Sequence, residues 1–247
     1  MHLITLSFDD GFLKSNLKIA ELYERHGLAA CFNVVATAHQ ADFALPNPSH
    51  RHPVGDFGVW NELQARGHEI MPHGYRHADK SRMPLAEAQD LVRRCLGVFA
   101  RELKGFEPKR AVFNIPYLAT TPELEAWLPS VVRAFRPAAA DPILPLPSRG
   151  LVRLGSTSFG PGNAEAAVDR WIAELLSRPS GWLLFCLHGL DDEGWGPIRS
   201  SYLERLLDRL VATPGVQVVP AGKALAAADA AAARAEPPAT RSRKERP

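Results

Sequence analysis

The chain has 247 residues, enough for one large domain or two small ones, and its 46% hydrophobic and 23% charged residues are ordinary for a globular protein. The formal net charge of +2 is too small to indicate a nucleic acid or an anionic membrane as partner, and no run reaches the ~18 apolar residues of a membrane helix. Three cysteines (Cys31, Cys95 and Cys186) lie in apolar stretches without C-x-x-C spacing, which predicts reduced core thiols and argues against a disulfide framework or a thiolate metal site.

Short apolar runs alternate with segments of helical period along most of the chain. Two segments, between residues 88 and 99 and between residues 203 and 211, place apolar side chains at i, i+3, i+4 and i+7, as amphipathic helices do. Several of the apolar runs are nearly continuous, which is typical of strands covered on both faces. We expect strands at His2–Phe8, Ala30–Val35, Glu69–Met71, Ala111–Ile115, Leu151–Leu154, Trp182–Leu187 and Val216–Val219.

The helix and loop signals complete the expected order of elements. Thr121 followed by Pro122 predicts a helix start, and Asn163 predicts a second one. The proline-bearing segment from Gln40 to Gly55 is long enough to be a functional loop, and its histidines, with His39 just before it, read as solvated. Alternation without a break in composition predicts one parallel α/β domain, either a barrel or a doubly wound sheet.

The two ends of the chain carry separate expectations. The first residues have no basic start, long apolar core or cleavage site, so we expect a cytoplasmic protein if Met1 is the natural start. We place the folded domain at residues 1–223 and an Ala/Arg/Pro-rich tail at residues 224–247. The tail is too poor in large apolar residues to order itself fully, so we expect disorder after about residue 236.

The first candidate for chemistry is Asp9 and Asp10, in the sequence ITLSFDDGF. Both follow the first predicted strand directly, and parallel α/β folds place their active sites at the carboxyl ends of strands. Taken alone, either aspartate could simply cap the helix that begins near Lys14.

Histidines occur at two further strand ends. His73 and His77 follow Glu69–Met71, and two histidines four residues apart can face one point if the segment makes a helical turn. Together with a carboxylate they would form a three-ligand metal site with room for water and substrate. His188 ends the most hydrophobic predicted strand, and Pro116 and Tyr117 turn the chain after another.

These motifs, in this order, resemble the polysaccharide deacetylases, also classed as carbohydrate esterase family four. The matching pieces are S-F-D-D-G, then G-H-E-I-x-x-H-x-x-x-H, then x-x-P-Y, and then L-H before a final helix, between about residues 3 and 222. The resemblance implies a distorted (β/α) barrel of about seven parallel strands in a single domain. It also implies metal-dependent hydrolysis of an N-acetyl group from an amino sugar.

The resemblance further implies a role for each matching residue. Asp9 would be the general base and His188 the general acid. Asp10, His73 and His77 would hold one divalent ion, for which we expect zinc, although cobalt, nickel and manganese also suit such ligands. The backbone N–H of Tyr117 would help to hold the oxyanion.

Some positions depart from the family pattern. Gly74 stands where Ser or Thr usually follows the first metal histidine, and Asn114 stands where an arginine usually pairs with the base. Without that cation we expect Asp9 to be less acidic than an arginine partner would make it. The sequence offers three arginines that could replace it: Arg110, Arg136 and Arg153.

Two questions about the site stay open at this level. The residue that would orient His188 could be Asp141, and Asp191 and Asp192 read as surface loop acids. Trp195 could stack on a sugar ring or anchor its loop.

The sequence leads to one main hypothesis and two alternatives. The main one is a metal-dependent N-deacetylase that acts on an N-acetylated sugar or small glycoconjugate, with neither nucleic acid nor membrane as partner and with an unknown oligomeric state. The alternatives are an O-acetyl esterase that uses the same site and a catalytically weak protein that binds metal and sugar.

Overall fold

The central strand of the fold is β1 (His2–Asp10), which is buried along nearly its whole length. The structure is a computed structural model that describes residues 1–43 and 51–235. Parallel to β1 run β2 (Cys31–Val34), β7 (Gly181–Leu187) and β8 (Val216–Val218), and β3 (Glu69–Pro72) continues the sheet beyond β2. The short strand β6 (Ile143–Leu144) pairs antiparallel with β7.

A second, two-stranded sheet turns this arrangement into a distorted barrel. It consists of β4 (Val112–Asn114) and β5 (Ala134–Arg136), which run parallel. Isolated bridges, Phe135 to Arg153 and Thr157 to Phe185, link β5 to β7. No backbone ladder joins β3 to β4 in the part of the chain that the structure describes, and we call this line the β3–β4 seam. Side chains close it, because Val112 donates its N–H to the sulfur of Met71 at 3.4 Å.

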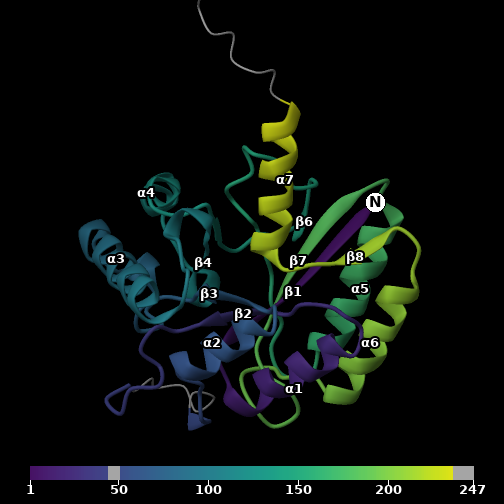
Figure 1. Cartoon of the computed structure of the whole chain (residues 1–247), viewed down its shortest axis with the longest axis horizontal. Helices are drawn as coiled ribbons and strands as arrows, with labels where there is room; N and C mark the ends of the chain where they lie inside the picture. The colour runs from purple at the N-terminus through teal and green to yellow at the C-terminus, as the bar shows by residue number, and fades with distance from the viewer. Residues whose placement is uncertain (44–50, 236–247) are drawn as a thin grey trace, which may run out of the picture.

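The helices lie around the strands (Figure 1). Their apolar faces turn inward, as in α6, where Leu203, Leu206, Leu207 and Leu210 are buried. Thr121 caps α4 by accepting a hydrogen bond from the N–H of Leu124, as its position before Pro122 predicts. The helices are α1 (Leu13–Glu24), α2 (Phe57–Ala65), α3 (Leu85–Glu102), α4 (Pro122–Trp127), α5 (Ala164–Ser177), α6 (Ser200–Ala212) and α7 (Ala221–Ala235), with 3₁₀ turns at Lys80–Arg82, Pro108–Arg110, Pro116–Leu118 and Leu128–Ser130.

The side chains that point into the barrel are apolar at one end of the strands and polar at the other. Toward the amino ends of the strands the interior is apolar, with Leu3 and Trp182 in one buried cluster. Toward the carboxyl ends the same faces carry Asn33, Asn114 and Arg136, all buried and hydrogen-bonded to one another. The period of two in each strand therefore separates a packing end from a polar end.

Helix α7 closes the apolar end of the barrel. Its first turns bury Ala221, Ala224 and Leu225 in the cluster that contains Leu3 and Trp182. The buried carboxylate of Glu69 accepts hydrogen bonds from the N–H groups of Gly222 at 3.0 Å and Lys223 at 2.9 Å, at the start of the helix. The boundary that we place at residue 223 therefore falls inside a packed helix. The predicted disorder after residue 236 lies outside the described residues.

The sequence predicts the long strands better than the short ones. Six of the seven predicted strands are present, whereas Leu151–Leu154 forms only an isolated bridge at Arg153. β5 and the antiparallel β6 were not predicted, because they are only two or three residues long and lie next to prolines. The equally short β4 and β8 could be predicted because each lies in a longer apolar run. The fold is thus a single-domain, mostly parallel distorted barrel with eight strands in the described residues.

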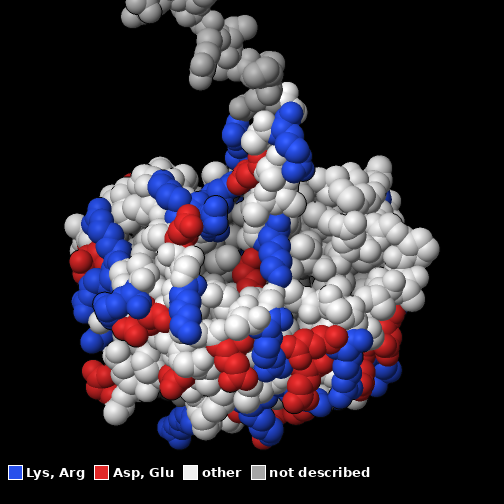
Figure 2. Space-filling model, viewed as in Figure 1, with Lys and Arg blue, Asp and Glu red and all other residues white. Residues whose placement is uncertain are grey.

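The surface gives few further indications of a partner. Figure 2 shows acidic and basic side chains interspersed over one face of the molecule, in keeping with the small net charge. None of the described helices has the length and apolar composition to cross a membrane.

Candidate active site

The carboxyl ends of β1, β3 and β7 converge on one pocket of about 250 Å³. All but one of the predicted site residues line it. The exception is Asn114, which is buried behind the pocket wall and contacts His73 and Arg136. The lining residues are Asp9, Asp10, His73, His77, Tyr117, Leu118, Ser158, Cys186, His188 and Trp195.

Asp10, His73 and His77 form a buried cluster of potential metal ligands. One donor atom from each lies within 4.8 Å of the others, and the Nε2 atoms of His73 and His77 are 3.4 Å and 3.2 Å from Asp10 Oδ1. The Nδ1 atom of His73 is 3.0 Å from the backbone oxygen of Asn114 and donates to it. This bond leaves the lone pair of Nε2 facing the cluster, as a metal ligand requires. The residues present therefore fit a divalent ion.

The backbone of these ligands is held in an uncommon conformation. Asp10 has φ +75° and His77 has φ +51°, in the left-handed region that non-glycine residues rarely adopt. The two histidines come together without the helical turn that their spacing allows: residues 73–79 form an irregular bend that brings the ring centroids to 4.9 Å. Strain of this kind, held by the surrounding fold, is typical of functional sites.

Gly74 is the residue that allows this bend. Its φ is +85°, and a Cβ at this position would lie 2.9 Å from Cγ of Pro116. The serine or threonine of the family pattern would therefore need both a different backbone and a displaced Pro116. The departure at Gly74 is a consequence of how the loop after β3 packs on the turn after β4.

Asp9 lies beside the cluster of potential ligands, and its side-chain partners include Asn33 and Arg136. It accepts a hydrogen bond from Asn33 at 2.7 Å and forms a buried ion pair with Arg136. Burial alone would raise the pKa of Asp9, but the charge of Arg136, supported by His73, His188 and Asn33, brings that pKa below its ordinary value. Our expectation of a less acidic base is therefore wrong, because a different arginine supplies the cation.

Arg136 reaches Asp9 from β5, the strand next to β4. Its Nε donates to Oδ1 of Asn114 at 2.7 Å, and the amide of Asn114 donates in turn to Asn33 at 2.7 Å. Asn114 therefore holds the arginine and does not replace it. Of the other two candidate arginines, Arg110 pairs with Glu107 and Arg153 pairs with Glu125, both at the surface.

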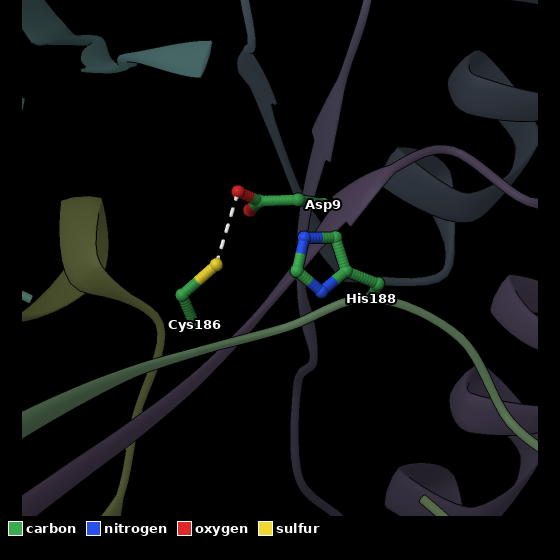
Figure 3. Close-up of side chains that lie close together, drawn as sticks. All are labelled: Asp9, Cys186 and His188. Carbon is green, nitrogen blue, oxygen red and sulfur yellow. Dashed lines mark hydrogen bonds between the residues drawn. The ribbon is translucent and has the colours of Figure 1, made fainter. Parts of the chain in front are cut away.

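His188 lines the same pocket and lies close to Asp9 (Figure 3). Burial lowers its pKa, while the nearby carboxylates of Asp10 and Asp9 act in the opposite direction. The ring packs edge-on against Trp195, with the ring centroids 5.5 Å apart.

The three aspartates that we considered as partners of His188 are engaged elsewhere. Asp141 binds Arg178 and the N–H of Ile143, and Asp191 binds the N–H of Ser200. Asp192 pairs with Lys14.

The rim of the pocket carries two partly exposed aromatic rings. Tyr117, with φ +57°, is 52% exposed, and its ring lies 4.5 Å from that of His77. Trp195 is 38% exposed and also packs on Gly160, so it both anchors its loop and borders the pocket. Away from the pocket, His39 packs on Phe57 and His52 packs on Phe12. His50 lies outside the described residues.

Three residues of the site were missed or misread in the sequence. Asn33 pairs with Asp9 in the β1–β2 register, but β2 gave no motif. Arg136 was only one of three candidates, since β5 was not predicted. Cys186 is a free and buried thiol, as the sequence predicts, but its place in the pocket was missed. It lies two residues before His188 and so faces the same side of β7. That spacing was the available signal.

Solved structures share this arrangement of elements. A polysaccharide deacetylase from Mycobacterium smegmatis, described as putative, matches with a TM-score of 0.65 and 16% identity, over 99% of this chain and 95% of that one. The peptidoglycan deacetylase PdaC from Bacillus subtilis matches with a TM-score of 0.55 and 15% identity, over 94% of each chain. The chain has the fold of the polysaccharide deacetylases.

Another structure with the polysaccharide deacetylase fold shows that the fold alone does not settle activity. It is a mutant of a CE4 family pseudoenzyme with restored enzymatic activity, and it matches with a TM-score of 0.54 and 11% identity, over 90% of this chain and 67% of that one. No protein-family model and no curated protein matches the sequence.

Proposed function

We propose that the protein is a metal-dependent deacetylase that removes an N-acetyl group from an amino sugar or a small glycoconjugate. One observation carries the proposal: a buried Asp/His/His ligand cluster adjoins a paired carboxylate and a histidine in one pocket. The fold shared with solved deacetylases is in keeping with this chemistry. The roles given below to single residues are part of the proposal.

The ligand cluster and Asp9 would divide the work of hydrolysis. A divalent ion held by Asp10, His73 and His77 supplies polarisation of the acetyl carbonyl and a lower pKa of water. Asp9, kept ionised by Arg136, accepts the proton of the attacking water. The adjacency of Asp9 and Asp10 at the end of β1 places this base next to the metal ligands.

Tyr117 and His188 would act on the other parts of the amide. The hydrogen bonds that hold the Pro116–Leu118 turn come from the N–H groups of Leu118 and Ala119, and neither uses the N–H of Tyr117. That N–H is the donor proposed for the developing oxyanion. His188 donates a proton to the departing nitrogen, because an amine leaves poorly as an anion. Asp9 and Asp10 stabilise its protonated form.

The size of the pocket favours a small substrate or a single sugar unit. Its volume of about 250 Å³ is slightly below the range for small-molecule sites, which is roughly 300–1,000 Å³. Tyr117 and Trp195 give the rim two aromatic faces on which a sugar ring could stack.

Acetate release tests the proposal. Metal-loaded protein is incubated with N-acetylated amino sugars, and the expected result is turnover that stops on chelation and returns with zinc. Binding of metal and sugar without turnover would instead identify a pseudoenzyme. An O-acetyl esterase would release acetate from acetylated sugars that lack an N-acetyl group, and it would depend less on His188 because an alcohol leaves more readily.

A further inference from the structure

The proposed mechanism gives no role to Cys186, although its thiol lies close to both Asp9 and His188. The Sγ atom is 3.2 Å from Oδ2 of Asp9, and Figure 3 shows the thiol and the ring of His188 on the same side of this carboxylate. One donor atom from each of Asp9, Cys186 and His188 lies within 4.8 Å of the others. Asp9 and Cys186 are buried, and His188 is partly exposed to the pocket.

Two paired strands build this second cluster. In the β1–β7 register, Ser7 pairs with Cys186 and Phe8 with Leu187, so Asp9 follows in line with His188. Cys186 and His188 are two residues apart and therefore point to the same side. The three side chains are thus set by the barrel and not by a flexible loop.

We propose that Asp9, Cys186 and His188 form a second cation site, for a soft divalent ion such as Zn²⁺ or Cd²⁺, beside the first. Ligands of tetrahedral zinc lie ~3.3–3.8 Å apart, given bonds of ~2.0–2.3 Å. The donor atoms of the cluster are close enough to reach this spacing by small side-chain adjustments. A thiolate among the ligands favours zinc and cadmium over hard ions such as magnesium.

The surrounding charges make this site the weaker of the two. Burial raises the pKa of the Cys186 thiol well above its usual range, so the thiolate forms reluctantly. The guanidinium of Arg136, beside Asp9 and Cys186, offsets part of this effect but also repels a cation. The first site is adjacent and would already hold a divalent ion. The thiol must also release its proton to solvent when the ion binds.

Occupation of the second site has a consequence for the proposed deacetylase, and this step rests on that proposed function. The ion would take the lone pairs of Asp9 and His188 and leave neither free to move a proton. Excess zinc or cadmium should therefore inhibit, while a single equivalent of metal activates.

Cadmium binding to metal-free protein tests the site without any need for turnover. Equilibrium dialysis counts the bound ions, and the ultraviolet thiolate-to-cadmium charge-transfer band reports the sulfur ligand. The expected result is two ions per chain, with the band developing at the weaker site. Cys186→Ser should abolish the band and weaken the second ion by more than ~10-fold while the first is retained. Cys31→Ser and Cys95→Ser are the matched controls and should keep the band.

If Cys186→Ser folds poorly, two further variants can still distinguish the two sites. His77→Ala should weaken the first ion and keep the band, and His188→Ala should weaken the second ion and keep the first. A single bound ion in the wild type, or a band that survives Cys186→Ser, would overturn the inference. An inactive protein that still binds two ions in this way would overturn the deacetylase and leave the second site standing.

Discussion

Arg136 on β5 forms a buried ion pair with Asp9 on β1, and Asn114 on β4, the strand paired with β5, holds the guanidinium in place. The cation beside Asp9 therefore comes from one strand further along than the resemblance implies. Because Arg136 is fully buried, the pair lies in a region of weak screening.

The pH profile of Arg136→Gln tests the importance of this pair. Loss of the cation removes the main opposition to burial, so the pKa of Asp9 should rise and the acidic limb of kcat/KM should move to higher pH by ~1–3 units. Arg153→Gln, which breaks a surface pair with Glu125, should leave the limb unchanged. An unmoved limb in a metal-loaded Arg136→Gln enzyme would mean that the limb does not report Asp9.

A double variant can move the cation beside Asp9 from position 136 to position 114. Asn114→Arg alone places a second cation beside Arg136 in the buried interior, and we expect it to lower the free energy of unfolding by several kcal/mol. Asn114→Arg with Arg136→Asn restores one cation near Asp9 and should recover much of that stability. Denaturant unfolding of the four proteins gives the coupling energy, and strict additivity of the two changes would contradict the shared role.

Metal dependence is expected to follow the Asp10/His73/His77 cluster. His77→Ala should bind zinc at least ~10-fold more weakly and lose the rise in Tm that zinc gives the wild type. His39→Ala is the matched control, because His39 packs on Phe57 away from the pocket. Binding should also weaken as pH falls, because the histidines must be neutral to ligate.

Removal of the proposed acid should separate chemistry from metal binding. His188→Gln is expected to keep the ion at the first site and to lose ~10²–10⁴-fold in turnover of an amide substrate. An activated ester, whose leaving group needs no proton, should suffer much less. An equal loss on both substrates would show that His188 positions the substrate or the base instead.

The buried Lys80, three residues after His77, gives a prediction about stability. Lys80 is 1% exposed, and burial lowers its pKa from 10.5 to about 8. Between these two values the unfolded chain keeps a proton that the folded protein releases, so this lysine destabilises most below pH 8 and least above pH 10.5.

Lys80→Met should therefore raise the free energy of unfolding at pH 7, by up to about 3 kcal/mol. The gain should fall as the pH rises through that interval. Loss of the contact with the ring of Phe113 offsets part of the gain. Denaturant unfolding at several pH values measures the difference from the wild type, and the exposed Lys104→Met is the control. A difference that does not change with pH would contradict a strongly lowered pKa.

Much of the site could be predicted because its motifs sit where long strands end. The runs before Asp9 and His188 are long and apolar, so their placement at the carboxyl edge follows from the strand pattern alone. The identity of the cation at Asp9 could not be predicted, because it depends on which strand lies beside β4. The bend at Gly74 was equally hidden, since the collision with Pro116 joins segments about forty residues apart.

The β3–β4 seam described above is the line along which the barrel should open first. The strands of each sheet share backbone hydrogen bonds, and isolated bridges link β5 to β7. At the seam, the hydrogen bonds across the gap include those of the Met71 sulfur and the His73 imidazole. Amide groups near such a line exchange with solvent through small local openings that leave the rest of the domain folded. His73 belongs to both the seam and the ligand cluster. An ion bound by Asp10, His73 and His77 would therefore also stabilise the seam and slow hydrogen exchange of the amide groups beside it.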